Sequence, residues 1–489
     1  MIATAQHRPN AFAAPLAHST GHRLQIFTAF AAMIGIPALC IAGGQAGVLR
    51  IVFPLLSVVA GAFLLWRSKP AYVELVCWLW FLTPFLGRMA DFQGGWSPAS
   101  AVELAPYVAA GISALPLLAS LGSLGSRKTL PYVCAMVAIL YGLILGLATL
   151  PLFNVLRALL NWLVPVVFGL FIYQNRDLYL EFRAAIERSF LFGTLITGAY
   201  GIYQFFVLPD WDRMWMLNVQ LNSFGAVEAM KVRVFSTMNA PAIYAAITVC
   251  GLLVLFNLKG KLRLLSVACG FLGLMLTVSR ASWLSLAAGG IYLLMRAGMR
   301  QRVRLVFATF ACGVFLLGLI QVPAVHDLLL QRMESFSDPS QDVSFSARVL
   351  GHQQAFQQIA QEPFGEGLGS TDTKHNTEGD DDIIGPHDST VLEFLYSLGW
   401  IGTLVYGMGL GSLIFQVIKA GDSDPFAVSA KSILVGFAAQ CLLNSVMIGV
   451  LGFMVWMFAS MSLAAADFTQ SAEEDRLRKD RRQSLYAAA

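Results

Sequence analysis

The sequence predicts an all-α polytopic membrane protein with about fourteen transmembrane helices, and two observations carry this prediction. Of the 489 residues, 57% are hydrophobic and only 13% are charged, whereas an average soluble domain carries about 25% charged residues. The apolar segments run for about 16 to 22 residues without alternation, while a β-barrel would show alternating strands of about 10 residues. The composition excludes a soluble globular protein and a disordered chain, and the net charge of +4 is too small to indicate a nucleic-acid-binding protein.

The apolar segments give the expected spans, whose total lies between about 12 and 14. They are 26–44, 51–66, 71–88, 101–121, 130–150, 152–173, 189–208, 241–258, 263–279, 282–297, 303–321, 390–418, 429–447 and 449–466. The chain then divides into a tail at 1–25, helices 1–11 over 26–321, one large loop at 322–389, helices 12–14 over 390–466, and a second tail at 467–489. The first span lacks a convincing cleavage site, so we interpret it as a retained helix rather than a signal peptide.

Orientation follows from the short connections that carry Lys and Arg, because such connections stay in the cytoplasm. The basic residues lie in every second connection and in the second tail, for example at Arg67, Lys69, Arg127, Lys128, Arg176, Arg188, Lys259, Arg263, Arg296, Lys419, Arg476, Arg478 and Lys479. Both termini are therefore predicted to be cytoplasmic. The segment 209–240 and the large loop 322–389 are predicted to lie on the outer side.

Neither the cysteines nor the acidic residues indicate a metal or cofactor site. All seven cysteines lie inside apolar segments, where cysteine acts as a small packing residue. The charge run Asp380–Asp382 has no spacing that would bring several oxygen ligands together. We interpret it as a solvated loop tip.

Six arginines on the outer side are exceptions to the charge rule. They are Arg50, Arg88, Arg157, Arg233, Arg280 and, in the large loop, Arg348. Arginine at the centre of a membrane helix costs about 2.5–3.5 kcal/mol on insertion scales, and it is tolerated where it lines a wet cavity or meets an anion. The alternatives are snorkelling to lipid head groups and pairing with an internal carboxylate such as Glu103 or Glu393. Because the planar guanidinium binds phosphate through two parallel hydrogen bonds, the set predicts an electropositive pocket for a lipid-borne pyrophosphate.

A second group of candidates precedes the span that begins at 390. Asp388 and Ser389 stand where a helix N-cap is expected. His387 or Asp388 could instead serve as a general base at the mouth of the pocket. The sequence leaves both interpretations open.

Three segments, in their order along the chain, resemble the O-antigen ligase and polymerase superfamily of bacterial envelope glycosyltransferases. The first is RVFSTMNAP at 233–241, and the second is LTVSRASW at 276–283. The third comprises PFGEGLG at 363–369, His387-Asp-Ser, and Gly399-Trp-Ile-Gly402. The resemblance covers about residues 230 to 466, with a large loop followed by three spans.

The resemblance implies an all-helical membrane glycosyltransferase of the bacterial inner membrane that needs no metal and no cofactor. Its donor would be a glycan linked to undecaprenyl pyrophosphate, used at the periplasmic face and surrounded by membrane lipids. Arg280 and Arg233, then Arg157 and Arg348, would bind the pyrophosphate, while Asp388 or His387 would take the proton of the acceptor hydroxyl. A chain-length regulator and a flippase are the expected protein partners, and nucleic acid is not one.

The spacing before Gly399 bears on which activity is expected. In the ligases, a His-(Asn/Ser/Gln) pair stands nine residues before Gly-x-x-Gly. In this chain Asp388 and Ser389 occupy those two positions, and His387 is one residue early. This favours an O-antigen or exopolysaccharide polymerase over an O-antigen ligase. A transporter of lipid-linked sugars ranks third, because the ionisable residues gather near one face of the membrane.

Overall fold

The computed structural model describes residues 20–119, 122, 125–219, 222–296, 298–299, 302–303, 357, 363–371 and 389–488. Throughout these residues the regular elements are helices, with a single isolated bridge between Gly225 and Val232. The all-α prediction is confirmed for this part of the chain. The expected span at 303–321 and most of the expected loop at 322–389 lie outside the described residues.

The longer helices follow the predicted order. They are α1 (Thr20–Ala42), α2 (Leu49–Arg67), α3 (Lys69–Gly94), α6 (Leu130–Thr149), α7 (Leu152–Gln174), α8 (Tyr179–Val207), α10 (Pro241–Leu255), α11 (Lys261–Leu276), α12 (Arg280–Arg296), α17 (Thr390–Lys419), α18 (Pro425–Gln440) and α19 (Gly449–Ala488). Among the described residues, nine helical segments are long and apolar enough to cross a membrane. The total of about fourteen stays a prediction, since α10, α11, α12 and α18 have only 15 to 17 residues.

One expected span is broken. Residues 101–121 were expected to form one helix, but the chain forms η2 (Ala101–Leu104), α4 (Ala105–Gly111) and α5 (Ala114–Leu118). Pro116 has no N–H to bond to the carbonyl of Ile112, which instead accepts from Leu115 N–H at 3.0 Å, and the helix is interrupted just before this point. Residues 101–118 together are still one of the nine segments long and apolar enough to cross a membrane. Two further differences concern length, because α8 begins at Tyr179 rather than at 189, and α19 continues through most of the tail expected at 467–489.

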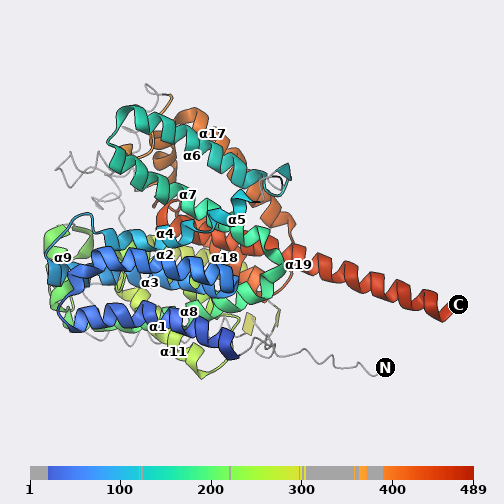
Figure 1. Ribbon diagram of the computed structural model, residues 1–489, viewed down its shortest axis with the longest axis horizontal. Helices are drawn as coiled ribbons and strands as arrows, with labels where there is room; N and C mark the ends of the chain where they lie inside the picture. Colours follow the sequence, from blue (N-terminus) through green and yellow to red (C-terminus); the bar gives the residue numbers. More distant parts are fainter. Residues whose placement is uncertain are drawn as a thin grey trace.

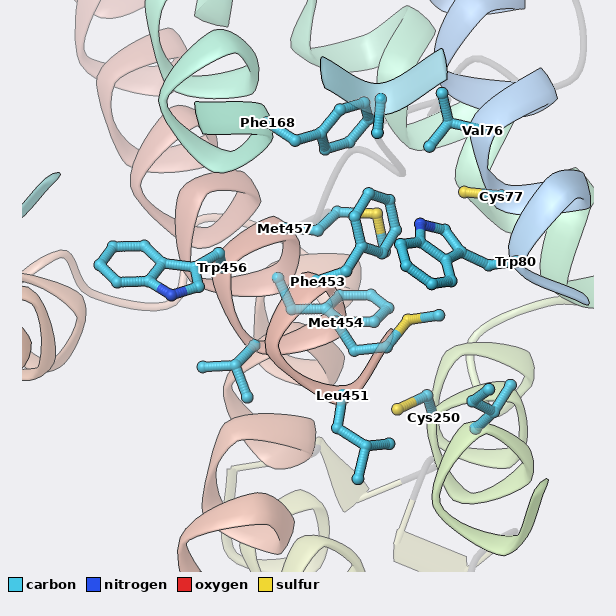
Figure 2. Packing of buried hydrophobic residues seen from close by; sticks show 14 of the residues in the cluster. Val76, Cys77, Trp80, Phe168, Cys250, Leu451, Phe453, Met454, Trp456 and Met457 are labelled. Carbon is cyan, nitrogen blue, oxygen red and sulfur yellow. The ribbon is translucent and has the colours of Figure 1, made fainter. Parts of the chain in front are cut away.

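The first half of α19 is the centre of the bundle. Phe453 packs against Phe168 of α7 and Trp80 of α3, with ring centroids 4.7 and 5.4 Å apart, as Figure 2 shows. Gly169 lets α7 approach closely, since a Cβ there would lie 3.0 Å from Trp456 Cβ. Close helix contacts through small residues are typical of membrane bundles.

The two ends of the bundle differ. The short helix α9 (Asp210–Val219) lies at one end, and the last part of α19 extends from the other, on the side where α1 begins (Figure 1). We call the first of these the α9 end. The helices α3, α8 and α11 end there, while α10 and α12 begin there, so the segments between these helices meet at this end.

Candidate functional site

The first motif is an extended segment at the α9 end. Residues 232–240 run without helix until Pro241, whose fixed φ suits the first turn of α10. Arg233 N–H donates to Phe224 O at 2.8 Å, and Val234 N–H donates to Leu276 O at 3.1 Å. The second of these bonds lays the segment against the last residue of α11, where the second motif begins.

The two motifs meet through Arg233. Its Nε donates to Thr277 O at 3.1 Å and its Nη2 to Val278 O at 3.3 Å. These carbonyls belong to a tight turn in which Val278 has φ 53° and Ser279 N–H donates to Thr277 Oγ1. Arg280 follows directly as the first residue of α12. We call residues 233–239 together with 277–280 the arginine junction.

Two features of the arginine junction favour negative charge. Both arginine side chains are half-buried, and the free N–H groups at the start of a helix favour negative charge. Arg233 holds the turn that presents Arg280, so the two sequence motifs form one structural unit. Phosphate binding by these two residues remains a prediction.

Arg88 enters the same unit from α3, with a partner that the sequence did not indicate. Arg88 Nε lies 2.8 Å from Asp212 Oδ1 of α9, and both side chains are fully buried. Its Nη1 donates to Met238 O and to Asn239 Oδ1, and its Nη2 donates to Ser236 O. Arg88 therefore pairs with an internal carboxylate, as one of the open alternatives allowed, although that carboxylate is not Glu103 or Glu393.

Asp212 is held by α8 as well. Its Oδ2 accepts from Tyr200 OH at 2.8 Å and from Gln204 Nε2 at 2.6 Å. Gln204 Oε1 in turn accepts the N–H groups of Phe235 and Ser236, at 3.0 and 2.8 Å. The extended segment is thus fixed from α3 on one side and from α8 on the other. No spacing in the sequence links these residues, because their contacts are tertiary.

Arg157 reaches the network through Glu103. The exposed Arg157 of α7 is close enough to Glu103 for a Coulombic interaction, and Glu103 Oε1 accepts a hydrogen bond from Asn239 Nδ2. Arg50 pairs with a carboxylate of α3, since its Nη2 is 2.7 Å from Asp91 Oδ1. Of the arginines grouped by the sequence, Arg50 and Arg88 are therefore ion-paired within the fold.

The third motif forms a separate contact, made of backbone. Glu366 N–H donates to Tyr396 O at 2.8 Å, Trp400 N–H to Pro363 O at 2.9 Å, and Leu368 N–H to Gly142 O at 2.9 Å. Gly399 has φ 58° within α17, which bends there. Gly367 has φ 92°, and a Cβ on it would lie 2.2 Å from Gly146 N, so a side chain cannot be accommodated. We call residues 363–369, 142–146 and 396–400 the glycine junction.

The start of α17 continues from the glycine junction. Thr371 Oγ1 donates to the buried Glu393 Oε1 at 3.1 Å. Ser389 is the N-cap residue by position, but its side chain makes no capping hydrogen bond. The predicted catalytic residues His387 and Asp388, the predicted phosphate ligand Arg348, and Asp380–Asp382 lie outside the described residues.

A comparison with protein families matches one part of the chain. Residues 265–407 match the family model described as O-Antigen ligase. The match runs from α11 into α17, so it includes Arg280, the 363–369 segment and the Gly399 bend, while Arg88, Arg157 and Arg233 precede it. No curated protein matches the chain.

Proposed function

We propose that this multi-pass membrane protein, whose residues 265–407 match the O-antigen ligase family model, polymerises oligosaccharide repeat units carried on undecaprenyl pyrophosphate. The reaction takes place at the periplasmic face of the bacterial inner membrane. In this proposal the α9 end of the bundle faces the periplasm, and both termini are cytoplasmic.

The meeting of Arg233 and Arg280 at the start of α12 is the observation that carries the proposal. Arg233 binds the carbonyls of the turn directly before α12, and Arg280 is the first residue of that helix. Both arginines therefore belong to a helix N-terminus, which favours a diphosphate. Arg280 and Arg233, assisted by Arg157 and Arg348, neutralise the charge that grows on the leaving pyrophosphate. Removing one such preorganised donor costs about 2.7–4 kcal/mol of transition-state stabilisation in enzymes that have been tested.

The transfer is a single displacement. The acceptor hydroxyl oxygen attacks the anomeric carbon, the bond from that carbon to the phosphate oxygen breaks, and undecaprenyl pyrophosphate leaves with the electron pair. Asp388 or His387 takes the proton of the hydroxyl. The configuration at the anomeric carbon is inverted.

An O-antigen ligase is the second candidate, and the description of the matched family favours it. A ligase would transfer the finished chain to an acceptor such as lipid A-core, with the same arginines on the same pyrophosphate. The position of Asp388, where ligases have histidine, keeps polymerase first.

Deletion in the native host, followed by gel analysis of its polysaccharides, separates the two activities. A polymerase predicts loss of all chains longer than one repeat, with single repeats still attached to lipid A-core. A ligase predicts long lipid-linked chains that never reach their acceptor. Unchanged polysaccharides would contradict both.

Reporter fusions test the orientation independently of activity. Fusions at residues 260, 300 and 475 are expected to report the cytoplasm, and a fusion at 350 is expected to report the periplasm. A cytoplasmic signal at 350 would reverse the orientation and move the proposed site to the wrong side of the membrane.

A further inference from the structure

The structure assigns Arg88 and Asp212 a positioning role: they fix the extended segment that carries Arg233 and Asn239, and through it the placement of Arg280. As an account of activity, this inference rests on the proposed function. Arg88 lies on α3 and Asp212 on α9. Their ion pair therefore connects these two helices to the extended segment, which belongs to neither helix.

The contacts of Arg88 converge on one short stretch of backbone. Its guanidinium donates to the carbonyls of Ser236 and Met238 and to the side chain of Asn239. The remaining Nε faces Asp212 at 2.8 Å. A guanidinium offers several N–H donors in a fixed planar fork, so its orientation sets the positions of these acceptors together.

The segment needs such support because it is locally strained. Ser236 has φ 54°, a left-handed conformation that a residue with a side chain adopts at an energetic cost and keeps only when its surroundings enforce it. Arg88 binds the carbonyl of Ser236, and Gln204 binds its N–H. Gln204 is itself bonded to Asp212, so one ion pair governs both sides of the strained residue.

The aromatic rings around Arg88 also keep its guanidinium group in one orientation. The guanidinium carbon lies 5.0 Å from the ring centroid of Phe235, 5.8 Å from that of Trp215 and 5.9 Å from that of Phe85. Glu103 is a further charge within Coulombic range. Replacing a buried ion pair with apolar residues often leaves the stability of a protein unchanged. The contribution of the Arg88–Asp212 pair therefore lies in positioning the extended segment rather than in stabilising the fold.

The consequence reaches the site by two routes. Arg233, three residues before Ser236, binds the turn that ends at Arg280. Asn239, three residues after Ser236, binds Glu103, which is within Coulombic range of Arg157. A displaced segment would therefore misplace Arg233 and the turn before Arg280, and would alter the charge near Arg157.

The decisive variant removes both charges together, Arg88→Met with Asp212→Asn, so that no buried charge is left alone. The asparagine oxygen can still accept from Tyr200 and Gln204. We expect normal protein abundance in the membrane, and polymer formation reduced at least tenfold. The matched control is Arg188→Met with Glu74→Gln, which removes a 2.6 Å ion pair between α8 and α3 away from the segment; it is expected to polymerise like wild type.

A second measurement does not depend on polymerisation. Thermal unfolding of the detergent-purified full chain is followed with and without inorganic pyrophosphate, since a ligand that binds the folded state raises the melting temperature. Wild type and the Arg188/Glu74 control are expected to show the increase, and the Arg88/Asp212 variant is expected to lose it. If that pattern appears in a chain whose deletion leaves polysaccharides unchanged, the proposed function fails and the positioning role stands.

The positioning role is overturned if the Arg88/Asp212 variant polymerises and responds to pyrophosphate like wild type. It is also overturned if Arg88→Lys and Arg280→Lys reduce activity by independent factors. We expect instead that the double lysine variant is little worse than Arg280→Lys alone, because residues that act through one another are not additive.

Discussion

The arginine junction and the glycine junction join distant parts of the chain by opposite means. In the first, the side chains of Arg233 and Arg88 bind backbone carbonyls, those of Thr277 and Val278 before α12 and that of Ser236. In the second, backbones meet so closely that a Cβ on Gly367 would lie 2.2 Å from Gly146 N. The difference separates two kinds of motif residue: those whose side chains can act on a ligand, and those that allow the fold to close.

The largest effect is expected from a side chain inside the glycine junction. Gly367→Ala forces a Cβ against Gly146 and places it at φ 92°, so we expect a loss of about 3 kcal/mol or more of unfolding free energy. Protein abundance in the membrane and the melting temperature measure it. Gly290→Ala in α12, where nothing lies within 4 Å of the new Cβ, is the control and should leave both unchanged or slightly raised.

In the arginine junction, substitutions should reduce polymer formation and leave the stability of the protein nearly unchanged. Arg280→Ala is expected to lower polymer formation by about 10² to 10³ with abundance near wild type. Arg280→Lys should rescue little, because an ammonium cannot reproduce the two parallel hydrogen bonds of the guanidinium. Full activity of the lysine variant would show that charge matters but that the proposed diphosphate geometry is wrong.

The next-largest effect is expected from substituting the proposed general base, Asp388. Asp388→Asn leaves Ser389, the residue at the N-cap position of α17, unchanged. The asparagine cannot accept a proton near neutral pH, and general base catalysis contributes about 10² to 10⁴ in rate. We expect at least a tenfold loss of polymer formation in a stably folded protein, and a milder loss in His387→Ala. An inactive His387→Ala with a normal Asp388→Asn would reverse the assignment and favour the ligase.

The smallest effect should come from an ion pair outside both junctions, Arg188 with Glu74. Arg188 is 52% exposed and pairs with Glu74 at 2.6 Å. Exposed pairs of this kind contribute about 0–1 kcal/mol and are screened by salt. Arg188→Ala should therefore shift the melting temperature by only a few degrees and leave polymer formation intact; a strong loss of activity would extend the functional region to the other end of α3.

The helices could be predicted because a long run of apolar residues is the dominant sequence signal of a membrane helix. The bounds of α3, α6 and α7 depart from the expected spans by a few residues. The break before Pro116 was missed, since the run around it is continuously apolar although its proline is visible. The close approach of the 363–369 segment to α6 was likewise not predicted, because the sequence does not show which helix packs against its glycines.

The arginine set shows the limit of sequence analysis. The sequence places Arg50 and Arg88 near the outer ends of helices but does not show what faces them. Both therefore belong to the set of six that predicts the pocket, although neither is among the four predicted phosphate ligands. Their carboxylate partners, Asp91 and Asp212, become neighbours only through the packing of α2, α3 and α9. The contact of Arg233 with the turn before Arg280 is also tertiary; the sequence connects the two arginines only because the family resemblance assigns both to the pyrophosphate.

The last helix has a practical consequence. α19 runs for 40 residues, about 60 Å at 1.5 Å per residue, whereas the hydrocarbon core of a bilayer is about 30 Å thick. Its side chains are buried up to Ala465 and exposed from Thr469 to Arg478, and the helix continues outward as a single rod (Figure 1). A fluorescent protein or an affinity tag attached near residue 488 would thus be held about 30 Å from the bundle, at the end opposite both junctions, so the labelled protein can be imaged or purified with its chemistry undisturbed.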